Sequence, residues 1–393
     1  MNGININYDG TNLNGEMLTI KHFITKIFRN RSRNRSRFPQ PFPIFSLIIH
    51  TFAQTHVPMK YITIIDIAKE LGISKSTVSR ALSGDTHNVK PETMKLIRDT
   101  ANRLGYKRNE IAVNLRHQRT RNIGVIIPEV VTSFFMNFIQ QTQKELRRCG
   151  YRTIITVSNE DPEQEAENLL MLEQCRVEGI LMSVCHKDRN IDLYNRVMSQ
   201  GIPIVFFDRK VDGIKSSQVR IDDYLMAFFM VESLIRSGCR KIVHLAGPDY
   251  ISNGYDRHRG YRAALEKFSI EYDERYVLKG GLTAEEGGAS IENFLSEGLE
   301  FDGVFGFTET ATLGAKSVLQ KMNYQIPEDV SLCCISGTAL CTLVHPTITA
   351  VEQPVFEMAS LSCKLLLEQI ADPNAEKESI ILRGTITKRE STR

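Results

Sequence analysis

Between residues 60 and 107, apolar positions recur at helical spacing in three short runs. The apolar side chains of the first run fall on one side of a 100° wheel: Ile64, Ile67, Ala68 and Leu71. Thr63 has an acidic residue three positions later, which predicts the start of a helix there, and Gly72 predicts its end. The pattern therefore indicates a short amphipathic helix that packs against a neighbour.

A second helix is expected over SKSTVSRAL, with Ser74 as its N-cap. Its apolar side chains face one way: Val78, Ala81 and Leu82. The opposite side carries hydrogen-bond donors and small hydroxyls: Lys75, Ser76, Ser79 and Arg80. A helix in the DNA major groove needs such a surface, because Arg and Lys match guanine edges and Ser or Thr match phosphates. A solvated face is the alternative, but a helix, a short turn and a donor-rich helix favour a helix-turn-helix.

The third helix is expected to begin at Pro91 and to end at Gly105. Its inward stripe is expected to hold Thr93, Leu96, Ile97, Thr100, Ala101 and Leu104. Three such helices would share a core of about 45 residues, which is small but feasible.

After Arg121 short β-branched runs alternate with amphipathic stretches. The expected strands are IGVII, RTIITV, GILMSV, PIVFFD, KIVHLAG, GVFGF and VSLCCI. The expected helices include Phe134–Cys149, Glu163–Gln174, Tyr224–Arg236 and Ala311–Met322. This alternation predicts parallel sheets covered by helices, in two doubly wound subdomains. Ligands bind beyond the carboxyl ends of such strands, so two facing subdomains predict a cleft that closes by a hinge.

Charge is unevenly distributed along the 393 residues, although the net charge is only +3. Residues 60–121 carry 13 Lys and Arg against 6 Asp and Glu, a net +7, and residues 1–59 carry +5. Residues 122–393 therefore carry −9. A basic head on an acidic body indicates that the head meets a polyanion and the body does not. No apolar run is long enough to span a membrane.

The first 58 residues differ from the rest of the chain. They combine Asn-rich sequence, a basic stretch over Arg29–Arg37 and an apolar run from Pro43, without a useful helical or strand period. A signal peptide would begin near residue 1. Residues 1–58 are expected to be disordered or to precede the true start at Met59.

The eight cysteines form no CxxC pair, so neither a metal site nor a cofactor is predicted. Scattered free cysteines indicate a reducing cytosol. Cys185 and His186 allow a reactive pair, although a buried cysteine at a strand end is favoured. No GxGxxG follows a strand, and no GxSxG, Walker or HExxH motif occurs, so an enzyme is not expected.

The stretches TIIDIAKELGISKSTVSRALSG and ETMKLIRDTANRLGYKRNEIAVNLRHQRTRNIGVIIP resemble the LacI/GalR family of bacterial repressors. The resemblance runs from about Tyr61 to the C-terminus. It implies an all-α helix-turn-helix DNA-binding head over 59–107, a hinge helix and linker over 108–120, and an effector-binding and dimerisation domain over 121–393. That α/β body would be periplasmic-binding-protein-like, with subdomains 121–219 plus 350–380 and 220–349 plus 381–393.

The resemblance also implies which residues meet DNA: Thr63, Lys75, Ser76, Thr77, Ser79, Arg80, Asn88, Asn109 and Leu115. Among these, Lys75, Ser76 and Arg80 match base-reading positions. Leu115 matches a leucine that wedges into the minor groove, where an apolar side chain unstacks a base step and bends the DNA.

The expected effector-binding residues are Ser133, Phe135, Asp208, Arg257, Glu309 and Ser336. Arg257 matches an arginine that hydrogen-bonds the effector. Two segments depart from the family pattern: Thr308-Glu309 replaces Asn-Asp, and the segment 334–337 replaces Gly-Phe-Asp-Asp. The pocket is therefore expected to differ from those of the best-known hexose and purine binders.

The expected function is that of a cytoplasmic transcriptional repressor controlled by a small-molecule effector, a sugar or sugar derivative. No apolar heptads follow the last strand, so a homodimer on a palindromic double-stranded DNA operator is expected. The alternative, an extracytoplasmic sugar-binding protein, does not explain the basic head.

Overall fold

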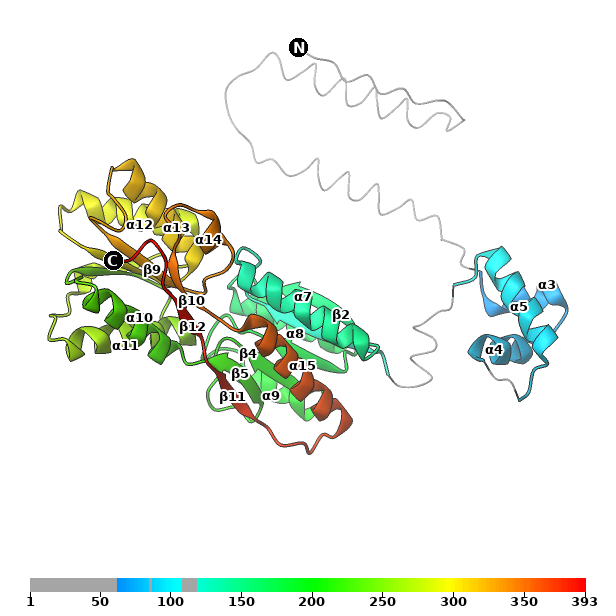
Figure 1. Ribbon diagram of the computed structural model, residues 1–393. Helices are drawn as coiled ribbons and strands as arrows, with labels where there is room; N and C mark the ends of the chain where they lie inside the picture. The colour runs from blue at the N-terminus through cyan, green and yellow to red at the C-terminus, as the bar shows by residue number, and fades with distance from the viewer. Residues whose placement is uncertain (1–61, 85–86, 108–118) are drawn as a thin grey trace, which may run out of the picture. The chain divides into compact units, whose positions relative to one another are not determined.

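The computed structural model describes residues 62–84, 87–107 and 119–393 (Figure 1). The expectations for residues 1–58, Asn109 and Leu115 lie outside these residues. The chain divides into two compact units, Met1–Arg108 and Asn109–Arg393, which are described separately.

The first unit contains the three expected helices, α3 (Ile64–Leu71), α4 (Lys75–Ser83) and α5 (Pro91–Leu104). The backbone N–H of Thr63 donates to the Asp66 carboxylate over 2.8 Å, and Gly72 closes α3 with a φ of 64°. The Ser74 hydroxyl accepts from the backbone N–H of Thr77 over 3.1 Å. The predicted starts and ends of these helices are confirmed.

The core of the first unit collects side chains from all three helices: Ile67, Ala68, Val78, Ala81, Val89, Met94, Ile97 and Ala101. The prediction for Leu96 was wrong, because its side chain is 54% exposed while Met94 is buried. Leu96 lies about 100° around the helix from Ile97, at the edge of the buried stripe.

The second unit contains two six-stranded sheets. The first has the order β11-β5-β4-β3-β1-β2, with β1 Asn122–Ile127, β2 Arg152–Val157, β3 Gly179–Met182, β4 Ile204–Phe207, β5 Ser217–Ile221 and β11 Ser379–Leu382. The second has the order β12-β10-β9-β8-β6-β7, with β6 Ile242–Ala246, β7 Val277–Lys279, β8 Gly303–Gly306, β9 Ser331–Ile335, β10 Thr349–Glu352 and β12 Thr385–Thr387. The seven predicted strands are confirmed, and the described strands pair in parallel except for β10 with β12.

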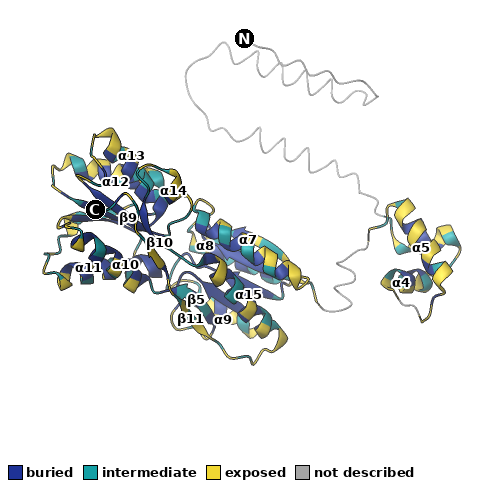
Figure 2. Cartoon of the chain, viewed as in Figure 1, coloured by how far each residue is buried: buried dark blue, intermediate teal, exposed yellow. Residues whose placement is uncertain are grey.

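Helices cover both sheets, so the central strands are buried, whereas the edge strands β2, β7, β11 and β12 and the outer sides of the helices are partly exposed (Figure 2). They are α7 Ser133–Arg148, α8 Pro162–Gln174, α9 Ile191–Ser199, α10 Asp223–Arg236, α11 Ser252–Lys267, α12 Ala284–Ser296, α13 Glu309–Lys321, α14 Leu340–Leu343 and α15 Val355–Ala371, with a 3-10 turn at Glu274–Tyr276. α15 packs against α7 and the first sheet.

The chain passes between the two sheets three times: after β5, after β10 and between β11 and β12. Because β10 pairs in the second sheet, the chain returns to the first sheet after Glu352 rather than at residue 350. Both sheets have the same strand order, so β4 and β9 hold equivalent positions. These three crossings make a hinge that joins two similar subdomains.

Candidate functional site

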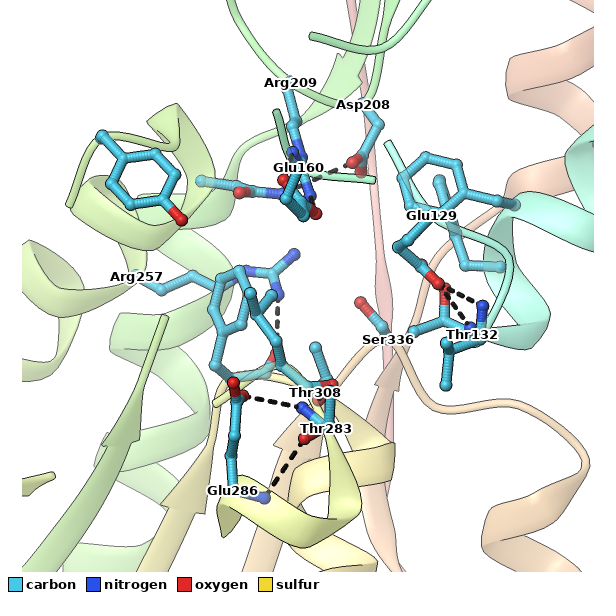
Figure 3. A pocket seen from close by; sticks show the side chains of 17 residues that line it. Glu129, Thr132, Glu160, Asp208, Arg209, Arg257, Thr283, Glu286, Thr308 and Ser336 are labelled. Carbon is cyan, nitrogen blue, oxygen red and sulfur yellow. Dashed lines mark hydrogen bonds and ion pairs between the residues drawn. The ribbon is translucent and has the colours of Figure 1, made fainter. Parts of the chain in front are cut away.

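A cavity of about 320 Å³ lies between the carboxyl ends of the two sheets (Figure 3). Both subdomains contribute to its wall: Glu129, Val131, Thr132, Phe134, Phe135, Glu160, Asp208, Arg209, Tyr250, Asn253, Arg257, Leu282, Thr283, Glu286, Phe307, Thr308 and Ser336. The loops that follow parallel strands converge there, as the topology requires. The expected cleft therefore has a definite position and lining.

Four of the six predicted effector-binding residues line this cavity: Phe135, Asp208, Arg257 and Ser336. Ser133 is the first residue of α7 and is not part of the lining. Glu309 is buried outside the lining, where its carboxylate accepts from the Thr338 backbone N–H over 2.7 Å and from the Thr338 hydroxyl over 2.6 Å. Glu309 therefore anchors the segment after β9.

Arg257 forms part of the cavity wall and is 1% exposed. Its Nε donates to Asp223 over 2.7 Å, and its Nη1 donates to the carbonyl of Phe307 over 2.7 Å. The guanidinium also lies 4.4 Å from the centre of the Phe307 ring. These contacts fix the plane of the guanidinium, so its remaining N–H donors are held in a preorganised geometry toward the cavity.

Asp208 is buried at the end of β4, and its backbone is left-handed with a φ of 63°. Burial, with the nearby charge of Asp223, raises the pKa of Asp208 to about 6, although Arg209 and Arg257 oppose this. The side-chain amide of Gln353 donates to Oδ1 over 3.3 Å, and that of Asn253 to Oδ2 over 3.5 Å. Both donor bonds are long, so the carboxylate keeps acceptor capacity for a ligand.

Gln353 also contacts the second subdomain, since its Oε1 accepts from the Ser336 hydroxyl over 2.6 Å. A chain of hydrogen bonds therefore runs from Asp208 through Gln353 to Ser336, beside the cavity. Gln353 follows the four-residue strand β10, whose short sequence gave no periodic signal. Gln353 was therefore not among the predicted site residues.

The other charged groups of the cavity are held by partners within the chain. Arg209 donates to both Glu160 oxygens over 2.7 and 2.6 Å. Glu129 accepts from the backbone N–H of Thr132 over 2.9 Å. Glu286 and Thr283 cap α12 reciprocally, as Figure 3 shows. These pairs stiffen the wall and leave Asp208 as the carboxylate with the weakest internal contacts.

In the helical unit, α4 turns Lys75, Ser76 and Arg80 to solvent, while Thr77 and Ser79 are half-buried. Among the described residues no ion pair involves Lys75 or Arg80. The Ser74 hydroxyl lies 2.8 Å from both the Ser76 and the Thr77 hydroxyls, so these two belong to the cap network. Two further predicted DNA contacts are also exposed: Thr63 and Asn88.

Residues 63–109 match the family model for bacterial regulatory proteins of the lacI family, and residues 120–380 match the model for periplasmic binding proteins and the sugar binding domain of the LacI family. The chain belongs to the LacI family. Its members are DNA-binding transcriptional regulators and not enzymes, which confirms the expectation from the missing catalytic motifs.

Full-length relatives agree with the LacI-family assignment. The chain is 28% identical over 332 residues to the HTH-type transcriptional regulator RegA of Clostridium saccharobutylicum, covering 84% of this chain and 99% of RegA. It is 28% identical over 334 residues to catabolite control protein A of Priestia megaterium, covering 84% and 99%.

Solved structures of LacI-family proteins share the fold. The CelR–cellobiose complex matches with a TM-score of 0.63 and 26% identity, covering 84% of this chain and 99% of CelR. The lac repressor dimer bound to operator matches with a TM-score of 0.74 and 21% identity, covering 85% and 99%. In the described part of this LacI-family chain, no helix has the length and apolarity to cross a membrane.

Proposed function

We propose that this LacI-family regulator is a repressor whose affinity for a palindromic operator is set by an uncharged sugar bound in the cavity. The observation that carries the proposal is that residues of both subdomains, Asp208 and Arg257 among them, converge on one cavity of about 320 Å³. This volume is typical of small-molecule sites, which range from roughly 300 to 1,000 Å³. The DNA partner implies a cytoplasmic location.

The charge balance of the lining supports an uncharged ligand. Four carboxylates line the cavity against two guanidiniums: Glu129, Glu160, Asp208 and Glu286 against Arg209 and Arg257. Both guanidiniums already neutralise carboxylates of this chain. An added phosphate or carboxylate would therefore meet excess negative charge in the cavity. Hydroxyl groups instead match Asp208, because an ionised carboxylate only accepts hydrogen bonds.

The aromatic lining adds a second argument for a sugar. Phe135, Phe307 and Tyr250 supply apolar surfaces against which the non-polar face of a sugar ring packs, while a few polar groups fix its orientation. Two structurally similar LacI-family proteins are described as complexes with cellobiose and with ribose, which fits the same ligand class.

Coupling between ligand and DNA follows from the fold. The ligand touches both subdomains, and three chain crossings connect them, so the ligand favours one of their arrangements. If the operator also favours one arrangement, the two affinities are reciprocally coupled. The exposed donors Lys75 and Arg80 on α4 then read base edges in the major groove.

An exposed apolar surface supports a homodimer. It consists of Met136 on α7, Leu340 and Leu343 on α14, and Phe356 on α15. These three helices are neighbours, since residues from each line a second hollow in the surface. An apolar surface of this kind marks a protein–protein contact, and a two-fold dimer places two reading helices on two half-sites.

The test is selection of bound sequences from a random duplex pool, followed by titration of the enriched duplex with a panel of neutral sugars. Enrichment of one palindrome, with an affinity that one sugar changes and anionic sugar phosphates do not, is the expected result. A pool without enrichment in the presence and absence of the panel would contradict the proposed function. An Arg257→Ala variant that still responds to the sugar would place the ligand elsewhere.

A further inference from the structure

Six exposed basic residues gather at one edge of the first subdomain, which is called the basic edge below: Arg119, Arg121, Lys144, Arg147, Arg148 and Arg152. They lie at the amino ends of β1 and β2 and in the last turns of α7. The ligand cavity lies at the opposite, carboxyl ends of these strands. In Figure 1 the carboxyl end of α7 and the amino end of β2 lie on the side away from the second sheet.

The arrangement of the basic edge is fixed by the fold. The backbone N–H of Arg152 donates to the carbonyl of Arg121 over 2.8 Å, which holds the two strand ends together. The Arg121 guanidinium lies 5.0 Å from the centre of the Tyr151 ring. Beside it a polar groove of about 430 Å³ is lined by Gln143, Arg147, Gly150, Tyr151, Arg152 and Thr153. Two guanidiniums thus flank one groove.

Two carboxylates, Glu145 and Glu178, lie at the basic edge against its six basic side chains. Arg148 pairs with Glu145 at 3.4 Å, but among residues 119–393 no ion pair holds Arg121, Arg147 or Arg152. The dipole of α7 accounts for basic residues in its last turn. It does not account for Arg121, which precedes β1, or for Arg152, which begins β2. Four of the six basic residues belong to residues 122–393, where they are unexpected because that part of the chain carries −9 in total.

We propose that the basic edge binds the phosphate backbone of DNA next to the operator, in contrast to the expectation that the body does not meet a polyanion. The proposal rests on the proposed function, because the DNA that the basic edge contacts is the DNA to which the helical unit binds. The chain enters β1 at the basic edge, and the segment from Gly105 to Arg119 spans at most about 50 Å. The tether is attached at this edge, which therefore has a higher effective concentration near bound DNA than the cavity edge, about 20 Å further along β1.

The experiment compares the full chain with a variant carrying Arg147→Gln and Arg152→Gln. The matched control carries Lys279→Gln and Lys321→Gln, which removes two exposed charges from the second subdomain. Affinity is measured against salt on two duplexes, the selected palindrome alone and the palindrome with flanks of about one and a half helical turns on each side. Thermal unfolding of each variant confirms that the fold is intact.

Each lost phosphate contact lowers the slope of log affinity against log salt by about 0.9. On the flanked duplex the variant should therefore have a slope shallower by about 2 for each protomer, or about 4 for the homodimer, and wild type should lose on the order of a hundredfold more affinity than the variant between 50 and 200 mM salt. On the palindrome alone, variant and wild type should agree. The control should match wild type on both duplexes.

The proposal is overturned if the variant has the wild-type slope on the flanked duplex, or if its slope falls by the same amount on both duplexes. Either result leaves the proposed function in place. If selection yields no palindrome, the proposed function fails. The same salt titration on a random-sequence duplex of about 40 base pairs still tests the basic edge, because phosphate contacts do not depend on the base sequence.

Discussion

Asp208 and Ser336 occupy the same position in the two subdomains. Asp208 follows β4 and Ser336 follows β9, the equivalent strands of two sheets with the same order. Both residues have left-handed backbones, with φ values of 63° and 65°, although neither is a glycine. Gln353 contacts both side chains. Two non-glycine residues in this conformation cost free energy that the surrounding structure must supply, a pattern typical of functional sites.

Removing the Gln353 side chain should weaken the closed arrangement of the subdomains. Gln353→Ala deletes two hydrogen bonds, each worth roughly 0.5–1.5 kcal/mol, so sugar affinity should fall by about 1–3 kcal/mol. Calorimetric titration of the sugar measures this. The matched control is Gln369→Ala, whose amide bonds Ser217 within the first subdomain and should affect only the free energy of unfolding. Equal sugar affinity in wild type and Gln353→Ala would show that the link has no role in closure.

Asp208 should make the stability of the protein depend on pH. Its pKa in the folded protein is about 6, above the value of about 3.9 in the unfolded chain. The folded state therefore binds more protons between these values, and the free energy of unfolding should fall as pH rises from about 4 to 6. This difference in pKa corresponds to up to about 3 kcal/mol in the free energy of unfolding.

Asp208→Asn isolates this contribution, because Asn tolerates the left-handed backbone and does not titrate. Denaturant unfolding of both proteins at several pH values should give a difference that changes between pH 4 and 6 and is constant above pH 7. A difference that stays constant from pH 4 to 8 contradicts the raised pKa.

The helical unit was predictable because its signals are local. Thr63 and Ser74 lie within three residues of the groups they cap, and Gly72 ends its helix by its own backbone conformation. The seven predicted strands, three of them only four residues long, were predictable because apolar runs with β-branched residues mark them. Leu96 was misplaced because its position at the edge of the buried stripe depends on how the three helices pack.

The cavity was predictable only in part, because its lining is decided by tertiary contacts. The role of Glu309 depends on Thr338, 29 residues away, which donates hydrogen bonds to both of its carboxylate oxygens. Asn253 lines the cavity and Gln353 contacts Asp208 beside it, both from segments without periodic apolar residues. A sequence pattern identifies the loops that meet at the strand ends, but the partner of each side chain decides which groups face the ligand.

Arg257→Ala should abolish the response to sugar and also reduce stability. The substitution leaves Asp223 buried without its 2.7 Å partner, and breaking such a pair costs about 3–5 kcal/mol. The double variant Arg257→Ala with Asp223→Ala should recover part of this loss, since no unpaired charge remains. Arg262→Ala, an exposed position on the same helix, is the control. The measurements are the free energy of unfolding and the operator affinity with and without sugar. A double variant less stable than Arg257→Ala alone would contradict the pairing argument.

Arg80→Ala should weaken binding to the selected palindrome by about 1–3 kcal/mol and relax the preference at one base position in each half-site. The reason is that Arg80 is exposed on α4 without an ion pair among the described residues, so its fork remains available for a guanine edge. Repeating the selection with the variant measures both effects. Lys95→Ala, an exposed position on α5, removes the same charge from another helix and should retain the wild-type base preference. Uniformly weaker binding with an unchanged preference would instead assign Arg80 to the phosphate backbone, because phosphate contacts carry no sequence information.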